Sequence, residues 1–309
     1  MSGTSQEQVA SSALDVRGEV DRWDCKDIWH CPRCRVALRH DSSTSAMVCP
    51  GCGSRLPIEN DILIVKDQTS ANNEVAQGFY DSPLWPKFRF WEWFTWICNG
   101  GERRARNQVL KHLPGTPGLD LLDVAIGDGV YLDWLPADWR IVGVDISRSQ
   151  LEACRRRAAG RKVWLAQCEA EDLPLESRRF DAVLSIGAFN YFNDPEGALR
   201  EMVRVARPGA PIVISDEMPD LTDRMLGHKL GMPGLDRWIV SRLMHLGDSF
   251  TAMVERHRNL DVQAIAGRVF KEFRFELVWR GVGYVLVGRA ADDPHLADRA
   301  RTDSCDSSP

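Results

Sequence analysis

Apolar runs of strand length recur through residues 119–217, and amphipathic stretches separate them. The runs are LDLLDVA (119–125), RIVGVD (140–145), KVWLAQ (162–167), FDAVLSIG (180–187) and APIVISDE (210–217). Residues 147–160 and 194–209 between them have helical character, with Ser147 as the expected N-cap of the first and Pro195 in the first turn of the second. Strands that alternate with helices predict an α/β fold, a parallel sheet with helices on both faces.

The pattern changes after residue 217. Residues 218–262 carry apolar positions at helical spacing, which predicts a helical lid inserted after the fifth strand. Residues 273–281 and 283–290 then follow as two strands joined by a tight turn. We expect this closing hairpin to add an antiparallel edge to the parallel sheet.

These patterns divide the chain into segments. Residues 114–290 form the main domain, which contains the lid insert at 218–262. Outside it we expect a disordered tail at 1–22, a small zinc ribbon at 23–66 whose cysteines are described below, an aromatic helical cap or linker at 67–113 and a second disordered tail at 291–309.

Composition and charge narrow the class of protein. The chain has 309 residues, of which 44% are hydrophobic, and a net charge of −5. This mildly acidic balance disfavours a broad nucleic-acid-binding face. No run reaches the roughly 18 apolar residues of a membrane span, and the first residues lack the apolar core of a secretory signal. We therefore expect a cytoplasmic protein.

The first apolar run ends in a glycine-containing turn with an acidic residue before it. Asp123 is followed by Ala125, Gly127 and Gly129, and Asp145 ends the next run 22 residues after Asp123. Such a turn brings the backbone close to a ligand, and an acidic strand end can accept hydrogen bonds from ribose hydroxyls. The combination predicts a nucleotide-type ligand at this edge of the sheet.

In these residues the chain resembles the class I S-adenosylmethionine (SAM) dependent methyltransferases, which have a Rossmann-like sheet. The resemblance covers about residues 119–290 and rests on LLDVAIGDG, VGVDIS, EAEDLP, FDAVLSIGAFNYF and EMVRVARPGAPIVISDE, in the order and spacing of that family. It is closest to the branch that includes the ubiquinone and menaquinone methyltransferases, which also holds many small-molecule tailoring enzymes.

The resemblance implies roles for individual positions. Asp123 would lie near the methionine amine, Asp145 would hold the ribose hydroxyls, and Glu169 and Ala170 would lie at the adenine edge. Two departures from the family pattern are Ala125, in place of the usual first glycine, and Cys168–Glu169, in place of the common Gly–Asp pair. The full set of implied SAM-binding residues is Asp123, Ala125, Gly127, Gly129, Asp145, Ile146, Glu169, Ala170, Ser185 and Ile186.

Four of the nine cysteines form two CxxC pairs. Cys31 and Cys34 are separated by 14 residues from Cys49 and Cys52. In a reducing compartment such pairs favour a metal over disulfides, and four thiolates suit tetrahedral Zn²⁺, with iron as an alternative. The spacing requires a short hairpin between the two pairs. We expect structural zinc in a ribbon that supports the fold or shapes the substrate site, while RNA binding by the ribbon stays open.

Candidates for catalysis come from three places. Tyr80 belongs to an aromatic-rich segment that either packs between ribbon and main domain or roofs the site. Asn190 and Tyr191 follow the fourth strand, and Asp216 and its neighbour Glu217 end the fifth. The methyl donor is already activated, so binding both reactants in line can supply most of the acceleration, and a base is needed only for a weakly acidic acceptor.

These observations predict a SAM-dependent methyltransferase that acts on a small, apolar or aromatic organic molecule at an oxygen, nitrogen or carbon atom. An RNA base methyltransferase that captures RNA with its ribbon is the first alternative. A SAM-binding scaffold without catalysis, or other SAM chemistry, is the second, because a fold does not determine a function. The sequence predicts neither the acceptor nor an oligomeric state.

Overall fold

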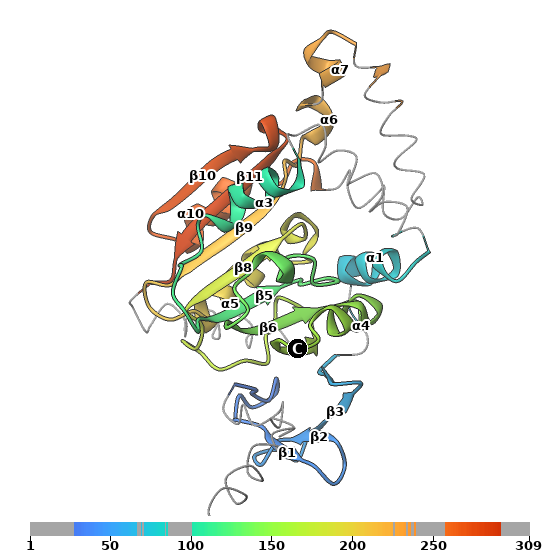
Figure 1. Cartoon of the computed structure of the whole chain (residues 1–309), viewed down its shortest axis with the longest axis vertical. Coiled ribbons are helices and arrows are strands. Elements are labelled where there is room, and N and C mark those ends of the chain that lie inside the picture. The colour runs from blue at the N-terminus through green and yellow to red at the C-terminus, as the bar shows by residue number, and fades with distance from the viewer. Residues whose placement is uncertain are drawn as a thin grey trace, which may run out of the picture.

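The fold is taken from a computed structural model, which describes residues 28–66, 69, 71–83, 85, 101–224, 226–232, 234–235, 238 and 257–291. Both expected tails, most of the aromatic segment and much of the lid lie outside these residues. Within the described part, the strands form one continuous sheet in the order β1-β2-β3-β4-β7-β6-β5-β8-β9-β11-β10 (Figure 1).

Five parallel strands form the centre of the sheet. They are β5 (Asp120–Val124), β6 (Arg140–Asp145), β7 (Lys162–Gln167), β8 (Ala182–Ile186) and β9 (Pro211–Glu217). Their spatial order β7-β6-β5-β8-β9 reverses direction beside β5, where the chain crosses from one half of the sheet to the other. All five correspond to the predicted apolar runs, and the α/β prediction is confirmed.

The closing hairpin is also confirmed. Strand β11 (Gly283–Arg289) pairs antiparallel with β9, and β10 (Phe273–Val278) pairs antiparallel with β11 at the edge. The short 3-10 helix η3 (Trp279–Gly281) joins the two strands.

Helices lie on both sides of the sheet. The first pair to be predicted, α4 (Arg148–Arg157) and α5 (Pro195–Val205), begin at side-chain caps: Ser147 accepts from the Gln150 amide and Asp194 from the Gly197 amide. The other described helices are α1 (Ala71–Tyr80), α3 (Glu102–Leu110), α6 (Leu221–Arg224), α7 (Leu226–Lys229), α10 (Val262–Val269) and the 3-10 helices η1 (Leu132–Trp134) and η2 (Phe189–Tyr191).

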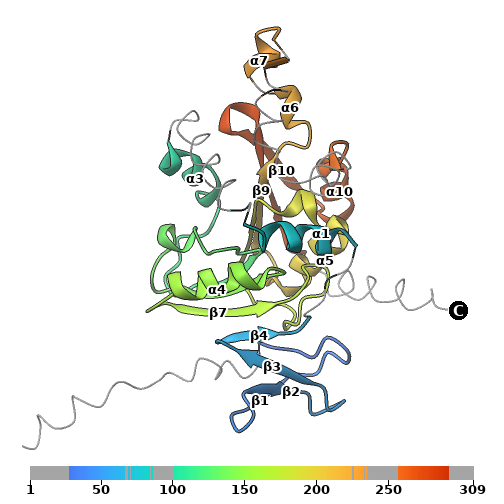
Figure 2. The ribbon, with the colours of Figure 1, turned by 90° about the vertical axis from the view of Figure 1, so that its right-hand side faces the viewer.

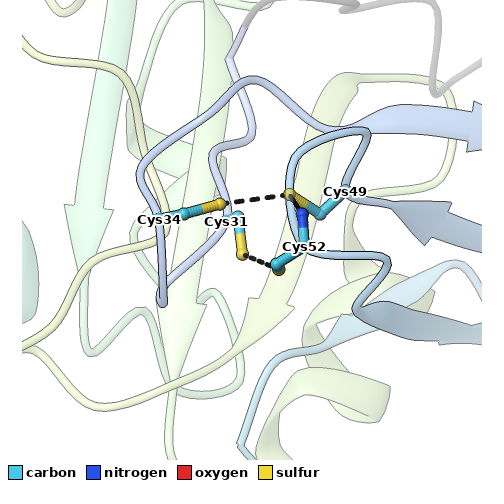
Figure 3. Close-up of side chains that lie close together, drawn as sticks. All are labelled: Cys31, Cys34, Cys49 and Cys52. Carbon is cyan, nitrogen blue, oxygen red and sulfur yellow. Dashed lines mark hydrogen bonds between the residues drawn. The ribbon is translucent and has the colours of Figure 1, made fainter.

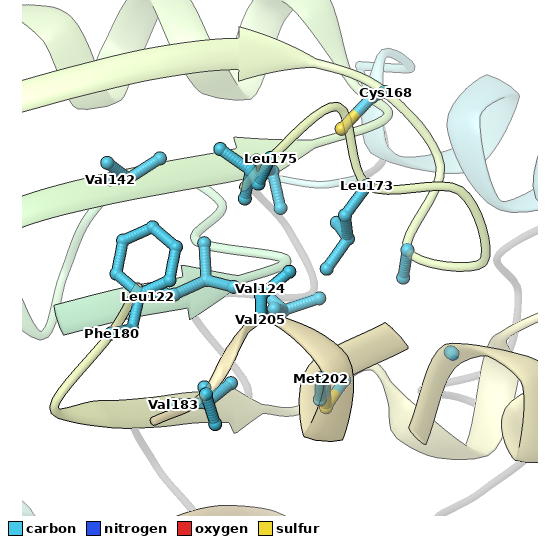
Figure 4. Close-up of a cluster of buried hydrophobic side chains, with 14 of the residues drawn as sticks. Leu122, Val124, Val142, Cys168, Leu173, Leu175, Phe180, Val183, Met202 and Val205 are labelled. Carbon is cyan, nitrogen blue, oxygen red and sulfur yellow. The ribbon is translucent and has the colours of Figure 1, made fainter. Parts of the chain in front are cut away.

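The core has two layers, one on each face of the sheet. Neighbouring strand residues alternate between them, so Leu122 belongs to one layer and Leu121 to the other. Figure 4 shows the first layer, where Leu122, Phe180 and Met202 gather between the strands and α5. Because both faces are covered, the central strands are apolar at successive positions, as in the predicted runs.

The ribbon continues the main sheet, which the sequence analysis did not predict. Strands β1 (Arg39–Asp41), β2 (Ala46–Val48) and β3 (Arg55–Glu59) form an antiparallel unit, and β4 (Ile62–Ile64) follows. The expected short hairpin between the CxxC pairs is β1–β2. Strand β4 pairs in parallel with β7, so the ribbon covers the edge of the central sheet (Figure 2).

The described part of the 218–262 insert begins with α6 and α7, which stand out from the body beyond β9 in both views (Figures 1 and 2). Helix α10 begins where the insert ends and packs against α5. Among the described residues, no helix combines the length and the apolar character that a membrane crossing requires.

Candidate cofactor and acceptor site

The turn after β5 has the backbone of a close-approach loop. Ala125, Gly127 and Gly129 have φ values of 61°, 58° and 71°, all in the left-handed region. Glycine enters this region at little cost, whereas Ala125 adopts it against its preference. A Cβ at Gly129 would lie 2.6 Å from the Cys154 sulfur and 2.9 Å from Leu132 Cδ1. Gly129 is therefore needed both for its backbone and for the packing of the turn on α4.

Asp145 ends β6 beside this turn and holds the neighbouring loops together. Its Oδ2 accepts from the Gly127 amide at 2.9 Å, and its Oδ1 accepts from the Ser147 amide at 2.8 Å. Each carboxylate oxygen has a further lone pair, so two hydroxyls can still be accepted. The predicted ribose acid is thus fixed in place by the turn that would lie under the cofactor.

Asp123 and Asp145 are buried close to each other, at 4% and 8% exposure. Burial, and then the charge of Asp145, raises the pKa of Asp123 to about 8. Burial also raises the pKa of Asp145 to about 6, against the lowering effect of its backbone hydrogen bonds. Two buried carboxylates with mutual repulsion favour a cationic ligand, which would offset both charges.

The adenine-side loop follows β7 and is bound to the ribbon. Glu169 is 7% exposed and forms an ion pair with Lys66, two residues after the end of β4. Ala170 is buried beside it. The Gln167 side chain donates to the Ile146 carbonyl at 3.1 Å and ties this loop to the ribose loop. Sequence reasoning missed Lys66, because nothing in the pattern placed the end of the ribbon next to Glu169.

Ser185 and Ile186 end β8 near the centre of the sheet edge. Ser185 is fully buried, and its Oγ has no hydrogen-bond partner among the described residues. Ile186 is partly buried and packs on the second core layer. A buried hydroxyl without a partner is costly, so this position can offer a hydrogen bond to a ligand.

Helix α1 lies across these loops and forms a roof. Gln77 donates to the Ile146 carbonyl at 3.0 Å, and the Asp81 carboxylate accepts from the Ser147 and Ser149 hydroxyls, both at 2.6 Å. At the other end of α1, Asn73 donates to Glu171 in the adenine-side loop. The polar contacts of α1 were not predicted, because their partners are distant in the sequence.

The aromatic face of α1 gathers around Phe79. Tyr80 lies edge-on to Phe79 and Trp85, with ring centroids 5.5 Å and 4.8 Å away, and the cluster includes Ile146 and Tyr191. Tyr80 therefore lies in an aromatic group that connects the ribose loop with η2. Six further aromatic residues of the segment lie outside the described part, namely Phe88, Phe90, Trp91, Trp93, Phe94 and Trp96.

The acceptor-side candidates meet at the ends of β8 and β9. The Tyr191 hydroxyl donates to Glu217 Oε1, and the Asn190 side chain donates to the Glu217 carbonyl at 2.6 Å. Asp216 is fully buried and accepts from the backbone amides of Asn190 and Glu217, each at 2.9 Å. Tyr284, from β11, donates to Asn190 Oδ1 at 3.0 Å and was not predicted as a site residue.

The four ribbon cysteines converge (Figure 3). Their sulfurs lie within 4.8 Å of one another, with 3.3 Å between Cys34 and Cys49 and 3.6 Å between Cys31 and Cys52. Four sulfurs about 2.3 Å from a tetrahedral zinc ion would be about 3.8 Å apart. The thiol donor set and its spacing therefore fit a tetrahedral metal.

Residues that flank the first cysteine pair also contact the adenine-side loop directly. Arg35 donates to the Leu173 carbonyl at 3.0 Å and forms an ion pair with Asp172. Trp29 forms an antiparallel bridge with Leu175, and the His30 amide donates to the Pro174 carbonyl at 2.9 Å. The ribbon therefore holds residues 172–175 on one side while β4 holds β7 on the other.

Four features together define the class I, Rossmann-like type of SAM-dependent methyltransferase domain. They are the strand order, the antiparallel strand β11 beside β9, the glycine turn after β5 and the acidic end of β6. Residues 122–214 match the family model described as a methyltransferase domain.

Several characterised proteins share this region. The demethylmenaquinone methyltransferase of Renibacterium salmoninarum is 34% identical over 122 residues, which are 39% of this chain and 50% of that protein. The O-methyltransferase cnsE of Penicillium expansum is 32% identical over 172 residues, 53% of this chain and 60% of that protein. The chain thus spans about half of the length of the curated relatives that it matches. The solved structure of a SAM-dependent methyltransferase from Aquifex aeolicus aligns with this chain at a TM-score of 0.40 and 18% identity. The alignment covers 60% of this chain and 89% of that chain.

Proposed function

We propose that the protein transfers the methyl group of SAM to a small, apolar or aromatic organic molecule. The observation that carries this proposal is the pair of buried carboxylates, Asp123 and Asp145, on either side of the turn with left-handed backbone. SAM carries a primary ammonium and a ribose, and the two carboxylates offer one acidic partner for each of these groups.

Each predicted contact has a role in the proposal. Asp123 binds the ammonium and Asp145 the two ribose hydroxyls, beside Ile146. Glu169 and Ala170 border the adenine, and Ser185 and Ile186 border the methionine chain, where the Ser185 hydroxyl gains a partner. The backbone of the turn, at Ala125, Gly127 and Gly129, approaches the cofactor closely because it carries no bulky side chain.

The aromatic roof supports an apolar or aromatic acceptor. Phe79, Tyr80 and Trp85 present ring faces and edges next to Tyr191 at the acceptor side. Such a surface excludes water and stabilises a flat molecule through apolar contact. Relatives that match this domain are named as a demethylmenaquinone methyltransferase and an O-methyltransferase, which is consistent with a small acceptor.

When bound, SAM supplies an activated methyl group, so the protein has mainly to bring the acceptor into line with it. Helix α1 contributes by closing over the ribose and adenine loops through Gln77, Asp81 and Asn73. Asn190 and Asp216 contribute by fixing the loop on the acceptor side.

We also propose that Cys31, Cys34, Cys49 and Cys52 bind a structural zinc ion as thiolates. The ribbon is too small to hold a core of its own, and a metal would stabilise its two CxxC turns. Its contacts with Glu169 and residues 172–175 give the metal an indirect role in shaping the adenine side.

Isothermal titration calorimetry with SAM tests the proposed cofactor site. Wild-type protein is expected to bind one SAM per chain, and Asp145→Ala is expected to weaken binding at least about 10-fold, because the ribose loses its charged acceptor. Asp133→Ala, in an exposed position on η1, is the matched control and should bind SAM as the wild type does. Equal affinity of wild type and Asp145→Ala would contradict the assignment. Transfer of labelled methyl from SAM to a small-molecule panel then tests the activity.

A further inference from the structure

Tyr191 and Glu217 form a hydrogen-bonded pair where η2 faces the end of β9. The Tyr191 hydroxyl donates to Glu217 Oε1; Tyr191 ends η2, and Glu217 is the last residue of β9. Burial, and then the charge of Glu217, raises the pKa of Tyr191 well above its usual value, so the phenol keeps its proton. The hydroxyl oxygen of Tyr191 can still accept a hydrogen bond from another group.

A buried network holds this pair in place. Asp216 accepts from the backbone amides of Asn190 and Glu217, and Asn190 donates to the Glu217 carbonyl. Tyr284 donates in turn to Asn190 Oδ1. Asp216, Asn190 and Tyr284 are each at most 2% exposed. A polar network of this kind is costly to bury and rigid when its groups are paired, which suits a site that must hold a proton carrier precisely oriented.

The pair lies next to the proposed cofactor site. Tyr191 packs in the cluster of Phe79, Tyr80 and Ile146, and Ile146 directly follows the ribose acid Asp145. Tyr191 also faces His257, with ring centroids 6.3 Å apart. The Tyr191 hydroxyl therefore reaches the region between the aromatic roof and the end of β9, where an acceptor would lie.

We propose that Tyr191 and Glu217 are a proton relay for the acceptor, and that the acceptor is an aromatic molecule methylated on a hydroxyl oxygen. This inference rests on the proposed methyl transfer. A neutral amine can attack the methyl group before it loses a proton, whereas a phenol needs its proton removed as the new bond forms. A tyrosine bonded to a carboxylate supplies that function.

The acceptor hydroxyl gives its proton to the Tyr191 oxygen while the Tyr191 proton passes to Glu217. The acceptor oxygen forms a bond to the methyl carbon, and the carbon–sulfur bond of the sulfonium breaks with its electron pair on sulfur. The products are the methyl ether, the neutral thioether and a protonated Glu217, which then releases its proton to solvent. Tyr191 is the catalytic residue that touches the acceptor, and Asp216 and Asn190 are positioning residues.

The test compares acceptors that match in shape and differ in acidity. At a pH of about 8, p-cresol keeps its proton like a tyrosine side chain, while the far more acidic p-nitrophenol is largely ionised. Matched pairs of hydroxylated aromatics of this kind are offered to wild type, Tyr191→Phe and Glu217→Gln with labelled SAM. Glu272→Gln, an exposed residue, is the control.

The relay predicts that both variants bind SAM with unchanged affinity and lose about 10²-fold or more in kcat on the weakly acidic member of a pair. On the acidic member the loss should be less than about 10-fold, because no proton has to be moved. A merely structural role would reduce both members equally and would lower the melting temperature, and this outcome would overturn the inference.

Failure of the inference is distinguishable from failure of the proposed function. A wild-type protein that methylates amines or carbon acids but no hydroxylated aromatic would contradict the relay and leave the methyltransferase intact. Full activity of Tyr191→Phe on the weakly acidic acceptors would contradict it as well. A wild type that binds SAM and transfers methyl to none of the three acceptor classes would overturn both.

Discussion

Asp123 and Asp145 determine how the site responds to pH. Their pKa values lie at about 8 and about 6, against 3.8 for an ordinary aspartate. The folded chain therefore binds more protons than the unfolded chain in this range. Their contribution to the free energy of unfolding is fully present below about pH 4. It is lost as the pH rises through about 6 for Asp145 and about 8 for Asp123.

SAM affinity should follow the opposite trend. The cationic ligand favours the ionised carboxylates, so binding at low pH must release protons. We expect the dissociation constant to fall between pH 6 and pH 8, the range of the two pKa values, by up to about 10-fold per unit for each proton released. Asp123→Asn should bind more weakly at pH 8 and show a flatter dependence. Titration calorimetry in buffers of different ionisation heat measures both, and pH-independent binding by the wild type would contradict the ammonium role.

Gly129 tests the fit of the turn on α4. In Gly129→Ala, the alanine must adopt a left-handed backbone. Its Cβ would also lie 2.6 Å from the Cys154 sulfur and 2.9 Å from Leu132 Cδ1. We expect a loss of about 2–4 kcal/mol in the free energy of unfolding. Gly127→Ala has the same backbone problem but open space around its Cβ, so it should lose only about 1–2 kcal/mol. Urea unfolding without SAM gives both values, and equal losses would show that packing does not matter here.

At the scale of elements, the junction between the ribbon and the main sheet bears most directly on the proposed cofactor site. β4 adds a parallel strand to β7, while Arg35 and Lys66 hold the adenine-side loop through Asp172 and Glu169. β7 is buried along most of its length, so it needs this cover to protect its free edge. Order in the ribbon should therefore propagate to the part of the loop that we propose borders the adenine.

Loss of the metal should therefore weaken SAM binding at a distance. We expect Cys31→Ser, or removal of zinc by a chelator, to unfold the ribbon and to lower SAM affinity by about 10-fold, the cost of reordering a short loop segment. His30→Ala removes the neighbouring side chain, which lies outside the sulfur cluster, and should keep both metal and affinity. Metal analysis and SAM titration on the same samples check this. Zinc-free protein with full SAM affinity would contradict the coupling.

The sequence predicted some elements better than others for a physical reason. The strands β5 to β9, the Ser147 cap, the position of Pro195 in the first turn of α5 and the closing hairpin follow from local periodicity and capping chemistry. The pairing of β4 with β7 joins residues about a hundred positions apart, and periodicity cannot report it. The continuous apolar run Ile62–Ile64 was the available hint, because such strands are usually covered on both faces.

The same distinction applies to the candidate site. The resemblance to a known family predicted Asp123, Gly127 and Asp145 as site residues, and in the structure they lie together at one edge of the sheet. The partners that no motif encodes could not be predicted. These are Lys66 at Glu169, Asp81 at the ribose loop and Tyr284 behind Asn190.

At the scale of the whole molecule, one sheet links the proposed zinc ribbon, the proposed cofactor site and the proposed acceptor side. The ribbon continues the sheet beyond β7, and α1 roofs the loops at its centre (Figure 2). The proposed acceptor side lies at η2 and the end of β9. The edges are closed by β1–β4 on one side and by β10 and β11 on the other. If the proposed sites are correct, the chain holds a metal and SAM together.

Native mass spectrometry of the freshly purified protein, before and after SAM is added, tests this most directly. The predicted result is a chain that carries one zinc ion and gains one SAM, or its demethylated product, with the mass confirmed after denaturation. A chain that carries zinc but takes up no SAM would contradict the cofactor site and the proposed enzyme. A chain that takes up SAM with no metal in its ribbon would contradict the zinc assignment.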